Sequence, residues 1–414
     1  MAAGADVSCD LRIDTQRLLR RLAALGEVGA DGGGASRLAL TPADKAGRDL
    51  VVGWMREAGL EIHVDPIGNV IGLWSAGPDA EVVLTGSHID TVTQGGRYDG
   101  NLGVLGGLEA IEALRESGLQ PRRSLGVAFF TNEEGVRFAP DMMGSLVFAG
   151  GLPLAEALDT RSSDGARLGD ELAAIGYAGE RFFPHDKISA YLELHIEQGP
   201  VLESLGIDIG VVLGVQGIRW MEVEFRGEAR HAGTTPMALR RDAGAAAFDF
   251  AAETGRLPEQ IGGAQLATIG RVVLEPNLVN VVARRALVTV DVRNTDAASL
   301  RQAADQVVAT ARRIAEARGV DVAVRDLVDL APVSFDPAVV DAVRAGAQAL
   351  GLSTVDLPSG AGHDAQMLAR VCPSGMIFVP SVGGVSHNPR EFTEPRDLQA
   401  GTNVLAQVLA QLAT

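Results

Sequence analysis

The side chains best suited to bind a metal ion follow an apolar segment near residue 85. Val82–Thr85 is β-branched or apolar throughout, as expected of a strand covered on both faces, and it leads into Gly-Ser-His-Ile-Asp. His88 and Asp90 would share one side of this strand, so that the Asp90 carboxylate accepts the second ring N–H of His88. The other His88 nitrogen is then free for a metal. Taken alone, the pair also fits a polar loop with satisfied hydrogen bonds.

Further acidic side chains follow the next predicted elements. Asp99 lies in GGRYDGNLG, whose glycines permit a tight backbone turn before a helix expected from Leu102 to about Ser117. The apolar strand predicted at Leu125–Thr131 ends at a polar cluster that contains Glu133 and Glu134. A solvated turn or a helix cap is the alternative interpretation of this glutamate pair.

A third predicted strand, Ala190–Ile196, delivers His195 and Gln198 before Gly-Pro ends it. In open α/β sheets the ligand site gathers beyond the carboxyl ends of the strands, so the polar groups of all three strands should converge there. Each histidine, taken singly, could equally be a surface or hydrogen-bonded core residue.

Together the candidates form a mixed nitrogen and oxygen set suited to zinc, with manganese, cobalt or nickel possible. Five candidate ligands suggest two divalent ions per subunit, with Asp99 as the shared bridge. Glu133 would take a proton from water and pass it to a leaving nitrogen. The candidate metal ligands are His88, Asp99, Glu134, His195 and His387.

The length and composition are those of a soluble globular protein with two domains. The chain has 414 residues, of which 46% are hydrophobic and 21% charged, and no apolar run approaches the roughly 20 residues of a membrane helix. Its start lacks the basic and apolar regions of an export signal, and Cys9 and Cys372 cannot form a disulfide framework, so a cytoplasmic location is expected. The formal net charge of −17 argues against nucleic acid or anionic membrane as a partner.

The chain predicts an α/β catalytic domain with a mixed central sheet flanked by helices, formed by residues 1–212 and 328–414. Residues 213–327 should form an inserted α+β domain of one sheet and two helices. Closure of this domain over the site as a lid is a further hypothesis. Gly210, Gly214 and Gly217 near the junction are possible hinges. In the catalytic domain we expect helices at Ile13–Leu25, Pro42–Ala58 with Thr41 as N-cap, Asp336–Leu350 and Leu398–Leu412, and strands at Glu61–Val64, Asn69–Trp74 and Met376–Val379. In the inserted domain we expect helices at Ala238–Thr254 and Ala297–Arg318, strands at Ala264–Val273, Ala286–Arg293 and Val320–Val324, and a connection at Leu327–Pro332.

Nearly the whole chain resembles the dinuclear-metal aminoacylases and carboxypeptidases, a metallopeptidase-like superfamily. Within it, the chain resembles the amidase branch of hydantoinase-associated carbamoylases, ureidopropionases and allantoate amidohydrolases. The segments that carry the resemblance are GSHIDTVTQGGRYDG, TNEEGVRF, ELHIEQGPVLE, GVQGIRWMEVEFRGEARHAGTTPM, NVVARRALVTVDVRN, GAGHDA and GVSHNPREFT. The most discriminating is HIEQGPVLE, because the resemblance implies that peptidase relatives usually carry a carboxylate at the position of His195.

The resemblance implies that His88 and His195 bind one ion, Glu134 and His387 the other, and that Asp99 bridges them, with Glu133 as general base and Asp90 behind the ligands. It also implies that Gln198, His231, Asn280, Arg293 and His363 contact substrate.

Among these, Arg293 and Asn280 would bind a substrate carboxylate. His231 would stabilise an oxyanion, in relatives from the neighbouring subunit, which implies a homodimer and a dimerisation role for the inserted domain. Alternatively, Arg293 pairs with Asp291 or Asp296, and His231 caps a turn.

The leading hypothesis is hydrolysis of the ureido C–N bond of an N-carbamoyl-L-amino acid. Allantoate amidohydrolase and β-ureidopropionase are substrate variants of the same chemistry, and aminoacylase or dipeptidase activity is disfavoured by His195. A non-enzymatic binding protein would be expected to have lost ligands, and none is missing. The Gly100–Gly107 segment lacks the G-x-G-x-x-G spacing of a nucleotide-binding loop.

Overall fold

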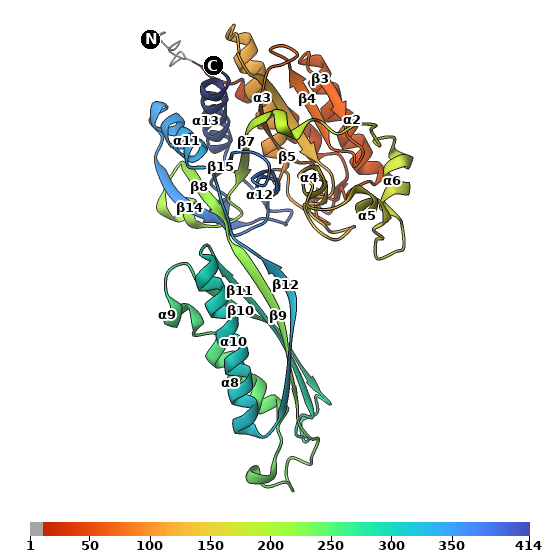
Figure 1. Ribbon diagram of the computed structural model, residues 1–414, viewed down its shortest axis with the longest axis vertical. Helices are drawn as coiled ribbons and strands as arrows, with labels where there is room; N and C mark the ends of the chain where they lie inside the picture. Colours follow the sequence, from red (N-terminus) through yellow and green to blue (C-terminus); the bar gives the residue numbers. More distant parts are fainter. Residues whose placement is uncertain (1–10) are drawn as a thin grey trace. The chain divides into compact units, whose positions relative to one another are not determined.

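The computed structural model describes residues 11–414, so Cys9 lies outside the described residues, and Cys372 is buried. The chain forms two compact units, one of residues up to Gly214 together with Ser334–Thr414, and one of Val215–Val333 (Figure 1). The sequence placed the two boundaries at 212/213 and 327/328. Both positions fall inside strands, β8 (Ile209–Val215) and β12 (Asp321–Leu330), and β12 continues beyond the strand predicted at Val320–Val324.

The first unit is built on a mixed nine-stranded sheet in the order β13-β8-β15-β7-β5-β6-β4-β3, with β14 paired to β8. At its centre β5, β6, β7 and β15 run parallel, because β5 pairs with both β6 and β7, and β15 pairs with β7. The edge strands β4 and β3 are antiparallel. The strands are β3 (Glu61–Val64), β4 (Val70–Trp74), β5 (Val82–His88), β6 (Ser124–Phe130), β7 (Ile188–Ile196), β13 (Val333–Ser334), β14 (Thr354–Ser359) and β15 (Ser374–Val379).

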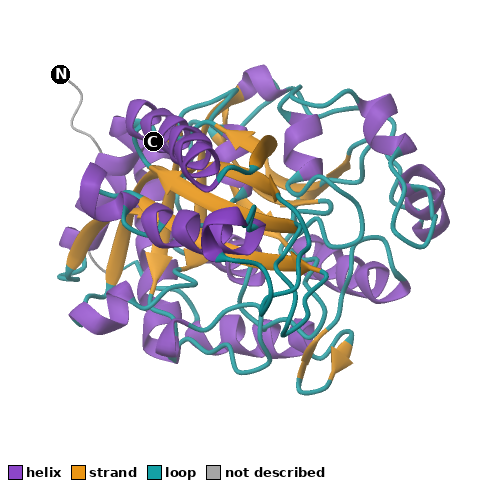
Figure 2. Cartoon of the chain, turned by 90° about the horizontal axis from the view of Figure 1, so that it is seen from below, coloured by secondary structure: helices purple, strands orange, loops and turns teal. Residues whose placement is uncertain are grey.

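Helices lie around the strands of this sheet (Figure 2). The glycines of α3 (Asn101–Glu116) let it approach the strands closely, since a Cβ at Gly103 would lie 2.6 Å from the Leu194 carbonyl oxygen. Helix α13 (Pro395–Ala413) packs on α3, and α12 (Asp364–Leu368) meets Glu193 on the opposite face of β7. The other helices are α1 (Thr15–Gly26), α2 (Pro42–Glu57), α4 (Met143–Phe148), α5 (Leu154–Asp159), α6 (Leu168–Ile175), α7 (Val201–Leu205) and α11 (Pro337–Ala349). As predicted, Thr41 caps α2, accepting the Asp44 N–H. Along the described residues, no helix is long and apolar enough to cross a membrane.

The second unit is a four-stranded antiparallel sheet in the order β10-β11-β9-β12. Its core joins alternate strand residues to helices α8 (Ala243–Thr254) and α10 (Ala297–Arg318), as the sequence predicted. The remaining elements are β9 (Gly217–Arg226), α9 (Leu257–Ile261), β10 (Leu266–Glu275) and β11 (Arg285–Asn294).

Two expectations for this unit were wrong. Helix α8 begins at Ala243 rather than Ala238, because Asp242 accepts the Ala245 N–H as the N-cap. Strand β12 runs through Leu330, which pairs with Ile218, so the expected connection at Leu327–Pro332 is largely strand. Its alternating exposed residues resemble a polar linker when they are read without the partner strand.

A buried ion pair fixes α2 in the first unit. The Nε of Arg48 lies 2.8 Å from Oδ2 of Asp44, and neither side chain is exposed. The same guanidinium donates to the Gly68 carbonyl at 2.6 Å and to Oγ1 of Thr131 at 3.1 Å. Arg48 therefore links α2 to the carboxyl end of β6.

We predict that Arg48→Met lowers the free energy of unfolding by about 3–5 kcal/mol, because it leaves a buried carboxylate without its cation. The matched control is Lys45→Met on the same helix, whose pair with Asp49 is exposed and is worth about 0–1 kcal/mol. Urea denaturation followed by circular dichroism measures both variants. Equal losses in the two variants would contradict the prediction.

Candidate metal centre

The carboxyl ends of three neighbouring parallel strands deliver the candidate ligands to one edge of the sheet. His88 is the last residue of β5, and His195 lies one residue before the end of β7. Glu133 and Glu134 follow β6, which pairs with β5. Asp99 immediately precedes Gly100, the N-cap residue of α3.

The Asp99 carboxylate lies between two groups of candidate ligands. Its Oδ1 is 3.5 Å from Nε2 of His88 and 3.3 Å from Nε2 of His195. Its Oδ2 is 3.4 Å from Nε2 of His387, which is in turn 3.4 Å from Oε2 of Glu134. Within each group, His88–Asp99–His195 and Asp99–Glu134–His387, the ligand atoms lie within 4.8 Å of one another. Imidazole and carboxylate donors in this arrangement suit divalent metal ions, with Asp99 common to both positions.

Backbone carbonyl groups orient the two buried histidines. Nδ1 of His88 lies 2.9 Å from the Asp90 carbonyl oxygen, and Nδ1 of His195 lies 2.9 Å from the Ile196 carbonyl oxygen. An Nδ1–H that donates to a carbonyl leaves Nε2 unprotonated, as a metal ligand requires. In agreement, Nε2 of His195 accepts the Gly100 N–H at 3.1 Å.

The predicted contact between the Asp90 carboxylate and His88 was wrong. Strand β5 ends at His88, so the alternation on which the prediction rested does not extend to Asp90. The carboxylate instead accepts the backbone N–H groups of Glu133 at 3.2 Å and Glu134 at 3.3 Å. Asp90 therefore positions the glutamate pair through its side chain and His88 through its carbonyl group.

The glutamate pair lies in a largely buried, acidic environment. Oε2 of Glu133 lies 3.4 Å from Nε2 of His88. Burial, assisted by neighbouring carboxylates such as Asp364, raises the pKa of Glu133 well above its ordinary range. Burial and Asp99 likewise raise the pKa of Glu134 to about 7. Carboxylates that are costly to ionise together favour a bound cation, so the residues present fit a metal centre.

Two residues not anticipated from the sequence hold Asp99 in place. Oε1 of Glu391 accepts the Tyr98 N–H at 2.8 Å and the Asp99 N–H at 3.1 Å. Oγ of Ser386 lies 2.7 Å from Oδ2 of Asp99 and 3.0 Å from Oε2 of Glu391. Ser386 and Glu391 flank His387, so one segment supplies a candidate ligand and positions another. No local spacing distinguishes Glu391 from an ordinary surface glutamate.

A third unanticipated residue, Arg37, joins the two segments that carry His88 and Asp99. Its side chain is fully buried. It donates from Nε to the Ile89 carbonyl at 2.7 Å and from Nη2 to Oδ1 of Asn101 at 2.9 Å. Close packing accompanies this link, because Gly100 has a φ of 65° and a Cβ there would lie 2.4 Å from the His88 ring. Only glycine fits that position.

A cavity of about 130 Å³ opens onto the candidate ligands. Gln198 lines it and donates from Nε2 to Oδ2 of Asp99 at 2.7 Å, while its Oε1 is buried and has no hydrogen-bond partner among residues 11–414. His363 also lines it, with Nε2 2.8 Å from Oγ of Ser359, and burial together with His195 holds the pKa of His363 well below its ordinary value. Asp141 lines the cavity and was not anticipated from the sequence.

The other predicted substrate residues belong to the second unit. Nδ1 of His231 accepts the Gly233 N–H at 3.1 Å and the Thr234 N–H at 3.2 Å, so this histidine caps a turn. Nη2 of Arg293 lies 2.8 Å from Oδ2 of Asp291. Both contacts were predicted as alternatives to substrate binding: a turn cap for His231 and a pair with Asp291 for Arg293.

Asp296, the other possible partner of Arg293, and Asn280 also have local backbone contacts. Asp296 pairs elsewhere, because it caps α10 by accepting the Ser299 N–H. The Asn280 carbonyl accepts the Ala232 N–H, and its residue is exposed. The roles of His231, Asn280 and Arg293 toward substrate stay predictions.

Comparison with known proteins agrees with this fold. Residues 84–411 match the model of Peptidase family M20/M25/M40, and the chain belongs to that family. It is 40% identical over 407 residues to an N-carbamoyl-L-amino acid amidohydrolase of Geobacillus stearothermophilus, covering 97% of this chain and 99% of the relative. It is 37% identical over 395 residues to an allantoate amidohydrolase of Bacillus subtilis, covering 94% and 95%.

A solved structure agrees as well. The crystal structure of a hydantoinase/carbamoylase family amidase from Burkholderia multivorans superposes with a TM-score of 0.94 at 44% identity, covering 97% of this chain and 98% of that one. The resemblance inferred from the sequence motifs is thereby confirmed, as is the α/β class with a mixed sheet.

We predict that Glu391→Ala weakens metal binding about 10- to 100-fold, because the backbone of Asp99 loses its acceptor. Competition with a chromophoric chelator measures the affinity, and circular dichroism checks the fold. Glu394→Ala, an exposed position on the same segment, is the matched control and should bind metal as the unmodified chain does. Unchanged affinity in Glu391→Ala would contradict the positioning role.

Proposed function

We propose that this protein hydrolyses the ureido C–N bond of N-carbamoyl-L-amino acids, giving the free amino acid, ammonia and carbon dioxide with one water consumed. It is a hydrolase acting on C–N bonds, as its family and named relatives indicate. The observation that carries the proposal is the Asp99 carboxylate between two ligand groups, with Glu133 beside it. Relatives about 40% identical over nearly the whole chain are named for this activity.

The metal centre in this proposal holds two divalent ions. His88, His195 and Asp99 would bind one, and Asp99, Glu134 and His387 the other. Zinc best suits the mixed donors, and manganese, cobalt or nickel are also compatible. When bound, the ions supply positive charge that polarises a carbonyl group and increases the acidity of water.

Glu133 is the proposed general base. Its carboxylate takes a proton from the attacking water and delivers it to the nitrogen that leaves. Burial raises the pKa of Glu133 above its ordinary range, which makes its carboxylate a stronger proton acceptor than an exposed glutamate. Asp90 supports this step by fixing the backbone of Glu133.

Substrate binding in this proposal uses both units. Gln198 and His363 line the cavity, and the unpartnered Oε1 of Gln198 is available to an N–H of the ureido group. Arg293 and Asn280 would bind the substrate carboxylate, with Arg293 exchanging part of its interaction with Asp291. His231 would stabilise the oxyanion within a homodimer. We further propose that the enzyme is located in the cytoplasm.

The second unit is also proposed to act as a lid or dimerisation domain. Of the three suggested hinge glycines, Gly210 is unsuited to that role. It pairs with Phe378 inside β8, and a Cβ there would lie 2.7 Å from Leu357. Close packing explains this glycine better than flexibility does. Gly214 and Gly217 stay candidates.

We predict that Glu133→Gln lowers kcat by about 10²- to 10⁴-fold, because the amide cannot accept the proton. Ammonia release from N-carbamoyl-L-methionine measures turnover, and metal content and circular dichroism should be unchanged. Glu57→Gln, an exposed position on α2, is the matched control with full activity. Full activity in Glu133→Gln would exclude this residue as the base.

The substrate is tested by comparing rates on N-carbamoyl-L-methionine, N-carbamoyl-β-alanine and allantoate. We expect the largest kcat/KM for N-carbamoyl-L-methionine, loss of activity on chelation, and recovery when a divalent metal is restored. A preference for allantoate would assign the chain to the activity for which its Bacillus subtilis relative is named. Activity that survives complete metal removal would contradict the metal-dependent mechanism.

A further inference from the structure

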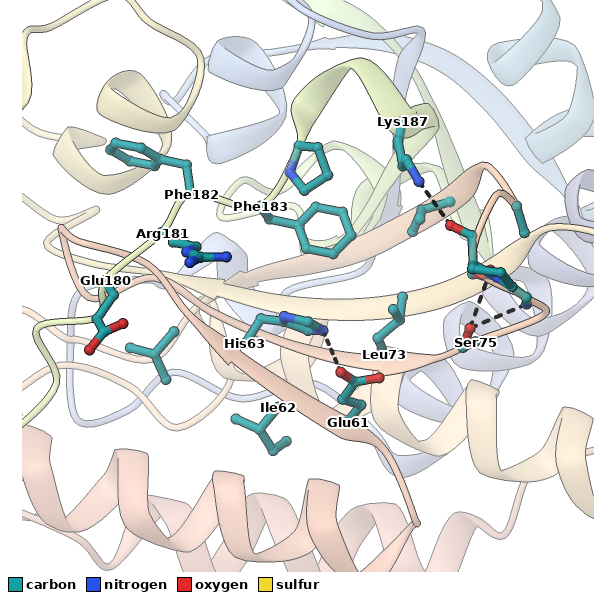
Figure 3. Close-up of a pocket in the computed structure, with 17 residues that line it drawn as sticks. Glu61, Ile62, His63, Leu73, Ser75, Glu180, Arg181, Phe182, Phe183 and Lys187 are labelled. Carbon is teal, nitrogen blue, oxygen red and sulfur yellow. Dashed lines mark hydrogen bonds and ion pairs between the residues drawn. The ribbon is translucent and has the colours of Figure 1, made fainter.

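A second and larger cavity, of about 540 Å³, lies at the opposite end of the sheet in the first unit (Figure 3). It is bordered by Val82 and Ser124, the first residues of β5 and β6, whereas His88 is the last residue of β5. A seven-residue strand is about 20 Å long at about 3.3 Å per residue. This cavity is therefore separate from the candidate metal centre.

On one side the cavity is lined by strands β3 and β4 at the edge of the sheet, and on the other side by residues of the segment 180–187. Glu61, Ile62 and His63 of β3 all border the cavity, and Glu61 and His63 share one face of the strand. Phe183 is buried, and its ring meets that of His63 edge-on with centroids 5.5 Å apart. With Leu73 beside them, these side chains form an apolar wall.

Charged groups of both signs lie beside this apolar wall. The guanidinium of Arg181 points into the cavity, and within the described part of the chain it makes no hydrogen bond or ion pair. Glu180 also has no such partner there, and Glu61 contacts only His63, at 3.5 Å. Lys187, in contrast, is already engaged, since its Nζ donates to the Pro78 carbonyl at 2.9 Å.

We propose that this cavity binds a free α-amino acid with an apolar side chain. Its carboxylate would pair with Arg181 and its ammonium group with Glu61, while its side chain packs against Phe183 and Leu73. A simple anion would meet two carboxylates, and a simple cation would meet the guanidinium. A compact zwitterion satisfies both signs of charge, and the cavity is within the usual size of small-molecule sites. Binding at this cavity requires none of the candidate metal ligands.

Titration calorimetry on the metal-free full-length chain tests the proposal, because chelation removes the metal centre as a competing site. The probes are L-phenylalanine, 3-phenylpropionate, which lacks the ammonium group, and 2-phenylethylamine, which lacks the carboxylate. We expect saturable binding of one L-phenylalanine per chain, at least about tenfold tighter than either analogue. No saturable binding, or equal binding of 3-phenylpropionate, would overturn the proposal.

Substitution of two lining residues, Arg181 and Glu61, locates the bound amino acid. Arg181→Met should weaken L-phenylalanine binding at least about tenfold, whereas Arg20→Met, an exposed arginine on α1 that does not line the cavity, should leave it unchanged. Glu61→Gln should reduce the difference in binding affinity between L-phenylalanine and 3-phenylpropionate, because the ammonium group loses its carboxylate partner. Equal affinities in Arg181→Met and Arg20→Met would place the ligand elsewhere and overturn the proposal. A chain that hydrolyses N-carbamoyl amino acids but binds no L-phenylalanine here would retain the proposed function and lose this site.

Discussion

The Asp99 carboxylate is the group on which the arrangement of the first unit depends. It is only 6% exposed, yet three histidine Nε2 atoms and the side chains of Gln198 and Ser386 all approach it. A buried carboxylate is stable only where its charge is compensated. The same surroundings that stabilise Asp99 also keep two groups of donors separate but adjacent. The same side chains therefore compensate the charge of Asp99 and bring the two groups of candidate ligands together.

Three kinds of structural constraint place the candidate ligands around Asp99. Parallel strands bring His88, His195 and the glutamate pair to one edge of the sheet. Gly100 lets α3 begin against the His88 ring, because a side chain there would occupy the position of the imidazole. Glu391 and Arg37 then fix the backbone on either side, at Asp99 and at Ile89. Site precision therefore comes from buried polar groups outside the ligand set, as expected of preorganised sites.

The sequence predicts the parts of this site that repeat a local pattern. Apolar strands that end in histidine or glutamate can be recognised from the local sequence. The candidate ligands and the α/β class could therefore be predicted from the sequence alone. The Asp90 carboxylate contact was misassigned because alternation stops where the strand stops. Glu391, Arg37 and Asp141 gave no signal, since their partners lie far away in sequence or their role follows only from the cavity. Strand β12 was predicted too short for a similar reason, because its pairing with β9 joins segments that are distant in the sequence.

The place at which the second unit leaves the first has an evolutionary meaning. Strands β8 and β13 are neighbours in the nine-stranded sheet, and the Phe335 N–H donates to the Leu213 carbonyl at 2.9 Å. The two ends of the Val215–Val333 insertion are thus already joined by the sheet of the host unit. Joining ends that already meet has a small entropic cost, so an insertion here can be gained, lost or exchanged without rebuilding the host. The sheet of the first unit is thus continuous across the junction, and the inserted unit can change without changing that sheet.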